Sequence, residues 1–151
     1  MPLSNLPEFP CRQVVVLAVS PDESDQAALR RIFTHSNWTI RTARDGREAV
    51  EHCRAGQVPV VLCARHLPDG DWKDLLQAFE AESHPPRLVV TSRHADDLLW
   101  AEVLNLGGYD VLPIPFDALE VFRVISLAWR HWVEETSHHP APRPREAAMV
   151  A

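Results

Sequence analysis

The stretch Val14-Val15-Val16-Leu17-Ala18-Val19 decides the fold. A continuous run of aliphatic, mostly β-branched residues is typical of a strand that is buried on both faces. The same pattern returns at residues 58–63, Val-Pro-Val-Val-Leu-Cys, and at residues 88–91, Leu-Val-Val-Thr. Strands buried on both faces belong to parallel sheets covered by helices, so these three runs predict an α/β domain.

Amphipathic segments separate the predicted strands. Apolar residues at helical spacing predict helices at residues 23–35, 47–55, 72–82, 96–106 and 116–135. Two further strands are predicted at residues 38–43 and 109–112, and a loop at residues 67–70. Five β-α units with right-handed crossovers favour a flavodoxin-like, doubly wound α/β fold, with a five-stranded parallel sheet in the order 2-1-3-4-5.

Length and composition indicate one domain. We expect a flexible arm at residues 1–12, a folded domain at residues 13–136 and a disordered tail at residues 137–151, because neither end carries core residues. The net charge of −6, without a dense Lys/Arg run, argues against a nucleic-acid partner. There is no apolar run of about 20 residues and no signal-peptide pattern, so we expect a cytoplasmic protein without a membrane partner.

The cysteines and histidines do not indicate a metal site. Cys11, Cys53 and Cys63 lack the spacing of metal ligands or of a disulfide framework, and His66 has no partner at ligand spacing. Cys63 lies in a predicted strand and is interpreted as a small buried hydrophobe. No metal and no cofactor are expected.

A functional site is expected beyond the carboxyl ends of the strands. In doubly wound sheets, this edge holds the ligand at the point where the strand order reverses. The residues delivered there by the first, third, fourth and fifth strands are Ser20, Pro21, Asp22, Ala64, Arg65, Thr91, Ser92, Pro113, Ile114 and Pro115.

Residues 14 to about 133 resemble a bacterial response-regulator receiver domain. Three stretches carry the resemblance: the first strand with Asp22 and Leu29-Arg30-Arg31; residues 60–64 leading into Leu67-Pro68-Asp69-Gly70; and residues 89–92 followed by residues 106–112 and 114–116. The resemblance implies participation in two-component signal transduction or a phosphorelay, through partner signalling proteins.

The resemblance also implies a set of site positions, and most of them are altered here. The family's Mg²⁺-binding acid pair falls on Ser20 and Pro21, with only Asp22 following. The phosphoacceptor aspartate falls on Ala64, four residues before Pro68. The phosphoryl-contacting lysine falls on Ile114 and the switch aromatic on Val111, whereas Thr91 matches.

These substitutions predict a pseudo-receiver that has lost its phosphorylation chemistry. A methyl group at Ala64 cannot attack a phosphoryl donor, and Mg²⁺ requires oxygen ligands that Ser20 and Pro21 scarcely provide. Ile114 cannot neutralise the charge of a phosphoryl group. No Gly-rich phosphate loop and no nucleophile paired with a base is present, so an enzyme is not expected and no catalytic residue is assigned.

We therefore expect a phosphorylation-independent protein-interaction module, with two alternatives. The first is a phospho-receiver that uses a displaced acid: Asp22, Asp69 or Asp71. Asp69 can equally shape the turn before Gly70, and Asp71 can cap the following helix. The second is a small-ligand binder whose pocket, lined by Ser20, Ala64, Thr91 and Ile114, would suit an apolar ligand. Thr91 can also be merely a strand residue whose hydroxyl bonds backbone.

Three tryptophans suggest where a partner would bind. Trp100 lies on the fourth helix, and Trp129 and Trp132 lie on the fifth, which carries more apolar residues than one sheet face requires. They either form an exposed patch or cover the edge of the domain. The first reading allows a homodimer through the fourth helix, fifth strand and fifth helix. Finally, the resemblance implies a cis peptide bond between Ile114 and Pro115.

Overall fold

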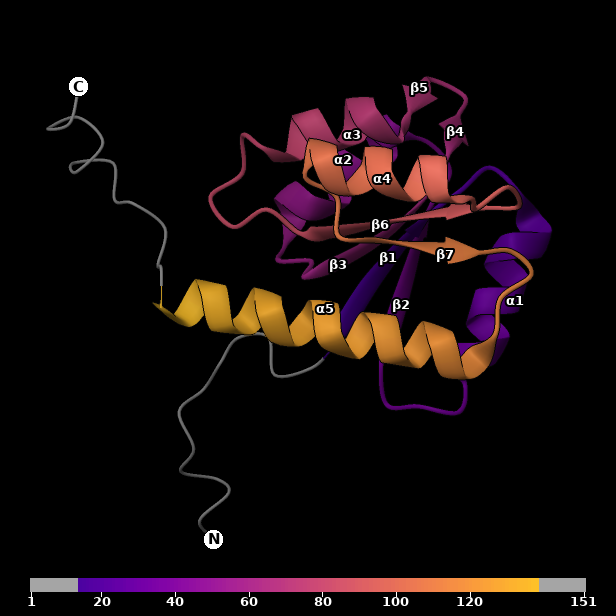
Figure 1. Ribbon diagram of the computed structural model, residues 1–151. Coiled ribbons are helices and arrows are strands. Elements are labelled where there is room, and N and C mark those ends of the chain that lie inside the picture. The colour runs from indigo at the N-terminus through magenta and orange to yellow at the C-terminus, as the bar shows by residue number, and fades with distance from the viewer. Residues whose placement is uncertain (1–13, 139–151) are drawn as a thin grey trace, which may run out of the picture.

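A computed structural model describes residues 14–138 (Figure 1). The expected arm at residues 1–12, and residues 139–151 of the expected tail, lie outside the described residues. Along the chain the elements are β1 (Val15–Val19), α1 (Glu23–Phe33), β2 (Thr39–Ala43), α2 (Gly46–Ala55), β3 (Val60–Ala64), β4 (His66–Leu67), β5 (Gly70–Asp71), α3 (Trp72–Phe79), β6 (Arg87–Ser92), α4 (Asp97–Leu106), β7 (Asp110–Pro113) and α5 (Ala118–His138).

The five long strands form one parallel sheet in the order β2-β1-β3-β6-β7. With β6 and β7 counted as the fourth and fifth strands, this is the predicted order 2-1-3-4-5, and the flavodoxin-like α/β fold is confirmed. In the central register Leu17 lies opposite Val61, and Val61 lies opposite Leu88. All three side chains are almost completely buried, as the continuous apolar runs predicted.

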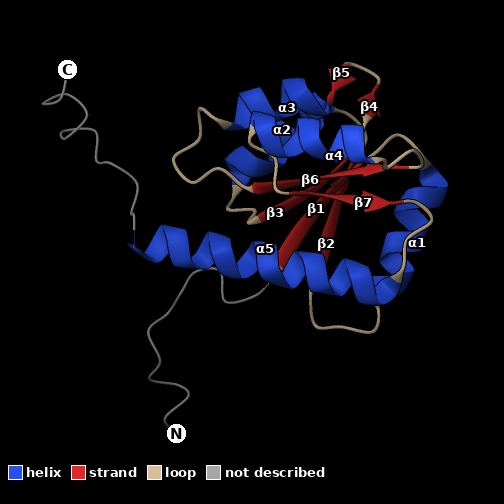
Figure 2. Ribbon diagram, viewed as in Figure 1, coloured by secondary structure: helices blue, strands red, loops and turns tan. Residues whose placement is uncertain are grey.

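Helices cover both faces of the sheet (Figure 2). On one face, Ala49 of α2, Leu75 of α3 and Leu99 of α4 belong to the same core cluster as alternate residues of the central strands. On the other face, Leu29 of α1 and Ile125 of α5 join the remaining strand residues. The sheet is thus the middle of three layers, and its polar side chains are confined to its edges.

The structure corrects three boundaries. Residues 66–71, expected to contain a loop, form a small antiparallel pair in which β4 meets β5. Helix α3 ends at Phe79 instead of residue 82, because the backbone of Glu80–Glu82 turns through short-range bonds to the end of the helix. Helix α5 spans Ala118–His138, whereas the sequence predicted a helix at residues 116–135. No helix within residues 14–138 is long and apolar enough to cross a membrane.

An aspartate stands at the start of each helix. Asp22, Asp45, Asp71 and Asp96 are the N-caps of α1 to α4, and Asp117 accepts a hydrogen bond from the Glu120 amide in the first turn of α5. Each carboxylate satisfies backbone N–H groups that have no partner inside the helix. Four of these helices directly follow a strand of the parallel sheet, and α3 follows β3 through the short β4–β5 pair. All five aspartates therefore lie toward the carboxyl edge of the parallel sheet.

Two glycines allow the chain to leave α4 and enter β7. Gly107 caps α4 with φ of 106°, in the left-handed region that favours glycine. At Gly108 an added Cβ would lie 2.5 Å from Cγ1 of Val103 and 3.1 Å from its carbonyl oxygen. Val103 is fully buried, so it has little room to move away.

We expect Gly108→Ala to lower the free energy of unfolding by about 1–3 kcal/mol through overpacking against Val103. Gly56→Ala is the matched control. An added Cβ there has no atom within 4 Å and the backbone is extended, so its effect should stay within about 0.5 kcal/mol. Urea denaturation of the two variants and the wild type measures the difference. Equal stabilities of the two variants would contradict the close approach at Gly108.

Candidate functional site

A cavity of about 270 Å³ opens at the carboxyl edge of the sheet, where β1, β3 and β6 end. Six of the seven altered or matching site positions identified in the sequence line it: Ser20, Pro21, Asp22, Ala64, Thr91 and Ile114. The seventh, Val111, is buried within β7 and does not line the cavity. The fold therefore gathers residues that are nearly 100 positions apart in the sequence.

Parallel pairing brings these residues together. Ala64 lies opposite Thr91 in the β3–β6 register, and the Ser20 amide donates to the carbonyl oxygen of Ala43 at 2.9 Å. The Ile114 amide donates to the carbonyl oxygen of Ser92 at 3.0 Å, which holds the chain after β7 beside the end of β6. The Ile114–Pro115 peptide bond is cis, as expected.

An ion pair between α1 and the loop after β6 forms part of the cavity wall. The guanidinium of Arg93, in the loop between β6 and α4, donates to both oxygens of Asp25 on α1, at 2.9 Å from Nη2 and 3.4 Å from Nη1. Nη2 also lies 3.7 Å from an Asp22 oxygen. The Asp25 side chain is only 10% exposed, and Arg93 is the cation that contacts it.

A buried amide supports the same corner of the cavity. Gln26, next to Asp25 on α1, is 4% exposed, and its Nε2 lies within hydrogen-bond distance of the carbonyl oxygens of Ala18, Ser20 and Ala43. These contacts join α1 to the ends of β1 and β2. Gln26 Oε1 has no hydrogen-bond partner among the described residues.

Asp22 is engaged by the start of its own helix. Its Oδ1 accepts from the Ser24 hydroxyl at 2.6 Å and from the amides of Ser24 and Asp25 at 2.8 and 3.3 Å. The Ser24 hydroxyl bond, then these amide bonds, and more weakly the charge of Arg93, hold the pKa of Asp22 below its usual value. Ser20 Oγ in turn accepts from the Asp22 amide at 3.1 Å.

The two other candidate acids also accept backbone hydrogen bonds. Asp69 reaches across to α2 and accepts from the amides of Gly46 and Arg47, each at 3.0 Å. The Gly46 bond is the main reason why the pKa of Asp69 lies below its usual value. Asp71 caps α3, accepts from the Lys73 amide at 3.0 Å, and forms a capping box with Asp74.

The lining of the cavity is more polar than that of the apolar pocket that the sequence suggested. Besides Ala64 and Ile114, its lining includes Arg65, His66, Asp25, Arg93 and His94. An apolar ligand is therefore disfavoured, since these polar groups would have to be desolvated. Within residues 14–138, no group of three or more His, Cys, Asp or Glu side chains is arranged to hold a metal ion.

Sequence reasoning missed Asp25 and Arg93. Asp25 sits inside a predicted helix and Arg93 inside a predicted loop, 68 residues apart, and neither belongs to a recognisable motif. The one available signal was position: Arg93 follows Thr91 and Ser92 at the carboxyl end of a buried strand, where functional side chains gather.

The three tryptophans do not form one exposed patch. Trp100 is 49% exposed, and its Nε1 donates to Asp110 at 3.0 Å. Trp129 is partly buried and packs against the core. Trp132 is only 4% exposed and contacts His84 edge-on, so its assignment to an exposed interface is corrected. The longer α5 places it over the edge of the domain, which is the second of the two readings above.

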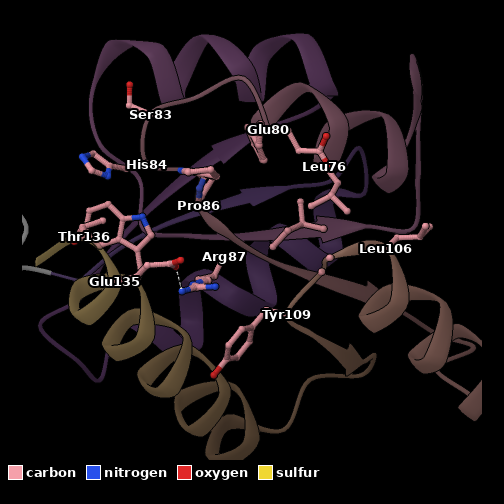
Figure 3. A pocket seen from close by; sticks show the side chains of 16 residues that line it. Leu76, Glu80, Ser83, His84, Pro86, Arg87, Leu106, Tyr109, Glu135 and Thr136 are labelled. Atoms are coloured by element: carbon pink, nitrogen blue, oxygen red, sulfur yellow. Dashed lines mark hydrogen bonds and ion pairs between the residues drawn. The ribbon is translucent and has the colours of Figure 1, made fainter. Parts of the chain in front are cut away.

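A second cavity, of about 330 Å³, lies at the opposite end of the sheet, beside the last turns of α5 (Figure 3). His84, Arg87, Tyr109, Trp132 and Glu135 are among the residues that line it, and Arg87 forms an ion pair with Glu135. Arg87 Nε and Trp132 Nε1 are buried and have no hydrogen-bond partner among the described residues. No sequence pattern pointed to this cavity.

The described cysteines behave as core residues. Cys63 is fully buried, as expected, and burial strongly raises the pKa of its thiol. Burial also raises the pKa of Cys53 to about 12. Cys11 lies outside the described residues.

Comparison with known proteins agrees with the family resemblance seen in the sequence. The family model described as "Response regulator receiver domain" matches residues 16–126. The DNA-binding transcriptional regulator NtrC of Escherichia coli (strain K12) is 28% identical over 123 residues, which cover 80% of this chain and 26% of NtrC. Response regulator MprA of Mycolicibacterium vanbaalenii is 30% identical over 108 residues, which cover 71% of this chain and 46% of MprA. The chain thus spans about a quarter to a half of the length of these relatives.

Solved structures show the same fold. The signal receiver domain of an HD domain-containing protein from Pseudomonas fluorescens Pf-5 has a TM-score of 0.77 and 25% identity, over 88% of this chain and 98% of that one. The beryllofluoride-activated NtrC4 receiver domain dimer has a TM-score of 0.73 and 23% identity, over 80% of this chain and 99% of that one.

The Asp69 contacts predict a specific pH dependence. We expect Asp69→Ala to lower the free energy of unfolding at pH 7 by about 0.5–2 kcal/mol, as for loss of a helix-capping carboxylate. Because the folded pKa of Asp69 is depressed, this stabilisation is complete above the unfolded pKa of about 3.9 and disappears as the pH falls through the folded pKa. Urea denaturation of both proteins from pH 7 to pH 2 should therefore show a difference that shrinks on acidification. A difference that persists unchanged at pH 2 would contradict this role.

Proposed function

The chain belongs to the response regulator receiver domain family, and from that premise we propose that it is a cytoplasmic signalling module that works without aspartyl phosphorylation. It would transmit its signal by protein–protein contact and would perform no catalysis of its own. A partner protein would supply the output.

The observation that carries this proposal is Ala64. It occupies the end of β3 inside the cavity, at the position where the family resemblance puts the phosphoacceptor, and its methyl group offers no nucleophile. The resemblance puts the metal-binding acids at Ser20 and Pro21 and the lysine at Ile114, and these three residues line the same cavity. The proposal therefore rests on four positions, which would serve three separate roles in phosphoryl transfer and none of which carries the side chain that its role needs.

The alternative use of a displaced acid has less support. Asp22, Asp69 and Asp71 each accept two or more backbone or hydroxyl hydrogen bonds at the start of a helix. Phosphorylation of any of them would break these bonds. The alternative of a small-ligand binder is supported by the position of the cavity at the carboxyl edge of the sheet. However, the charged lining of the cavity favours a polar ligand over the apolar ligand that the sequence suggested.

The surface of α4, β7 and α5 is the proposed contact face. Leu98 and Leu119 are 79% and 81% exposed, and Trp100, Leu104, Leu106 and Leu127 are each at least 38% exposed. These side chains all come from α4 and α5, which flank the edge strand β7. Exposed apolar groups concentrated on two helices are typical of an interaction surface. A homodimer is the simplest partner, since one self-complementary surface is sufficient.

We expect no stable phosphoryl adduct on the wild-type protein. Incubation with acetyl phosphate and Mg²⁺ should leave its intact mass unchanged, because Ala64 provides no carboxylate, and beryllofluoride should not raise its melting temperature. A phosphorylatable receiver treated in parallel is the positive control. A stoichiometric adduct would refute the proposal, and peptide mapping to Asp22, Asp69 or Asp71 would establish the displaced-acid alternative.

Restoring a single residue should not restore the chemistry. We expect Ala64→Asp to remain unmodified by acetyl phosphate, because Ser20, Pro21 and Ile114 still lack the metal ligands and the cation that stabilise phosphoryl transfer. Intact-mass spectrometry tests this directly. Efficient phosphorylation of Ala64→Asp would show that the rest of the cavity is more competent than proposed.

If the contact face forms a homodimer, Trp100→Glu should shift the sedimentation profile toward the monomer, with at least about a tenfold weaker association. The half-exposed indole is removed and a charge is placed on the face, while the fold should persist. Ala55→Glu, an exposed change at the end of α2, is the control and should leave association unchanged. A wild-type protein that sediments as a monomer at high concentration would exclude the homodimer.

A further inference from the structure

Arg93 is placed to act as the cation of the candidate site. Its guanidinium contacts both oxygens of Asp25 and lies near Asp22, and all three residues line the same cavity. Bidentate arginine–carboxylate pairs are among the stronger charged interactions in proteins because both hydrogen bonds form in one fixed geometry. Asp25, at 10% side-chain exposure, requires such a partner because an isolated buried carboxylate is costly.

The pair also joins parts of the fold that the sheet keeps separate. Asp25 belongs to α1, which covers one face, whereas Arg93 lies in the loop that leads to α4 on the other face (Figure 1). Ser92, the last residue of β6 before this loop, accepts at its Oγ from the His94 amide at 3.0 Å. The position of the loop, and with it the start of α4, is therefore tied to α1 across the carboxyl edge.

We propose that Arg93 is the resident cation of this cavity: it neutralises Asp22 and Asp25, holds the β6–α4 loop against α1, and makes a divalent metal ion unnecessary. This inference rests on the proposed function, because it states how the site keeps one fixed arrangement without phosphoryl chemistry. It differs from the family pattern in both partners, since neither Asp25 nor Arg93 is a position that the resemblance assigns.

Removal of Arg93 should expose a cation site that the wild type keeps occupied. In the full-length chain, Arg93→Ala leaves two carboxylates facing the cavity, and hard divalent cations bind carboxylate oxygens. We expect Mn²⁺, titrated as MnCl₂ and followed by water-proton relaxation, to bind Arg93→Ala at least about tenfold more tightly than it binds the wild type. Mn²⁺ should also raise the melting temperature of the variant and leave that of the wild type unchanged.

Two further variants locate the effect. Arg93→Ala combined with Asp25→Asn should lose the gained Mn²⁺ binding, because one of the two carboxylates is gone. Arg65→Ala removes the other arginine of the cavity lining and should behave as the wild type. The inference is overturned if the wild type binds Mn²⁺ as tightly as Arg93→Ala, if Arg93→Ala gains no binding, or if the double variant keeps it.

A measurement on the wild type alone covers the case in which Arg93→Ala does not fold. Mn²⁺ should leave the amide resonances of Asp22 and Asp25 sharp, because Arg93 occupies their carboxylates; selective broadening of these two resonances would overturn the inference. The outcome is separable from that of the proposed function. A phosphoryl adduct on the wild type would refute the proposed function, and the Mn²⁺ measurements would still decide separately whether Arg93 occupies the two carboxylates. If Arg93→Ala gains no Mn²⁺ binding and the wild type forms no adduct, the inference about Arg93 fails and the proposed function stands.

Discussion

Burial of the sheet on both faces is the constraint from which the rest of the structure follows. Leu17, Leu62 and Val89, in the three central strands, are at most 1% exposed, and their neighbours along each strand are buried from the other side. Such strands have no place for a charged side chain, so helices must cover both faces and parallel crossovers must connect the strands. Polar groups that serve a function can then only gather where the strands end.

At the carboxyl edge the geometry of a receiver fold is present, and the proposed function requires only that its chemistry differs. Ser20, Ala64, Thr91 and Ile114 still converge, because strand register and not side-chain chemistry brings them together. Three of the charged groups around them have partners within the protein: Arg93 and Asp25 pair with each other, and Asp22 accepts from the first turn of α1. A network whose members satisfy one another favours one conformation, whereas a phosphorylation site must be able to change between two.

The sequence predicted the fold better than it predicted the side-chain arrangement. The strands and their order follow from apolar runs such as residues 14–19, whose burial requires no knowledge of distant residues. The cis bond at Pro115 was likewise expected, from the family resemblance. Trp132 was misjudged because its burial depends on His84 and on the length of α5, neither of which its own neighbours in sequence reveal. The Asp25–Arg93 pair was not predicted for the same reason, because two residues that lie far apart in the sequence and on different elements produce no periodic pattern in it.

The aspartates that begin the helices have a consequence for the electrostatic field at the carboxyl edge. The N-terminus of a helix carries a partial positive charge from its aligned peptide dipoles, and such ends commonly attract phosphate and other anions. Here Asp22, Asp45, Asp71, Asp96 and Asp117 each place a carboxylate on that end. Each of the five helix dipoles is thus partly offset by a carboxylate of the protein itself, and the positive potential that the helix ends present at the carboxyl edge is reduced.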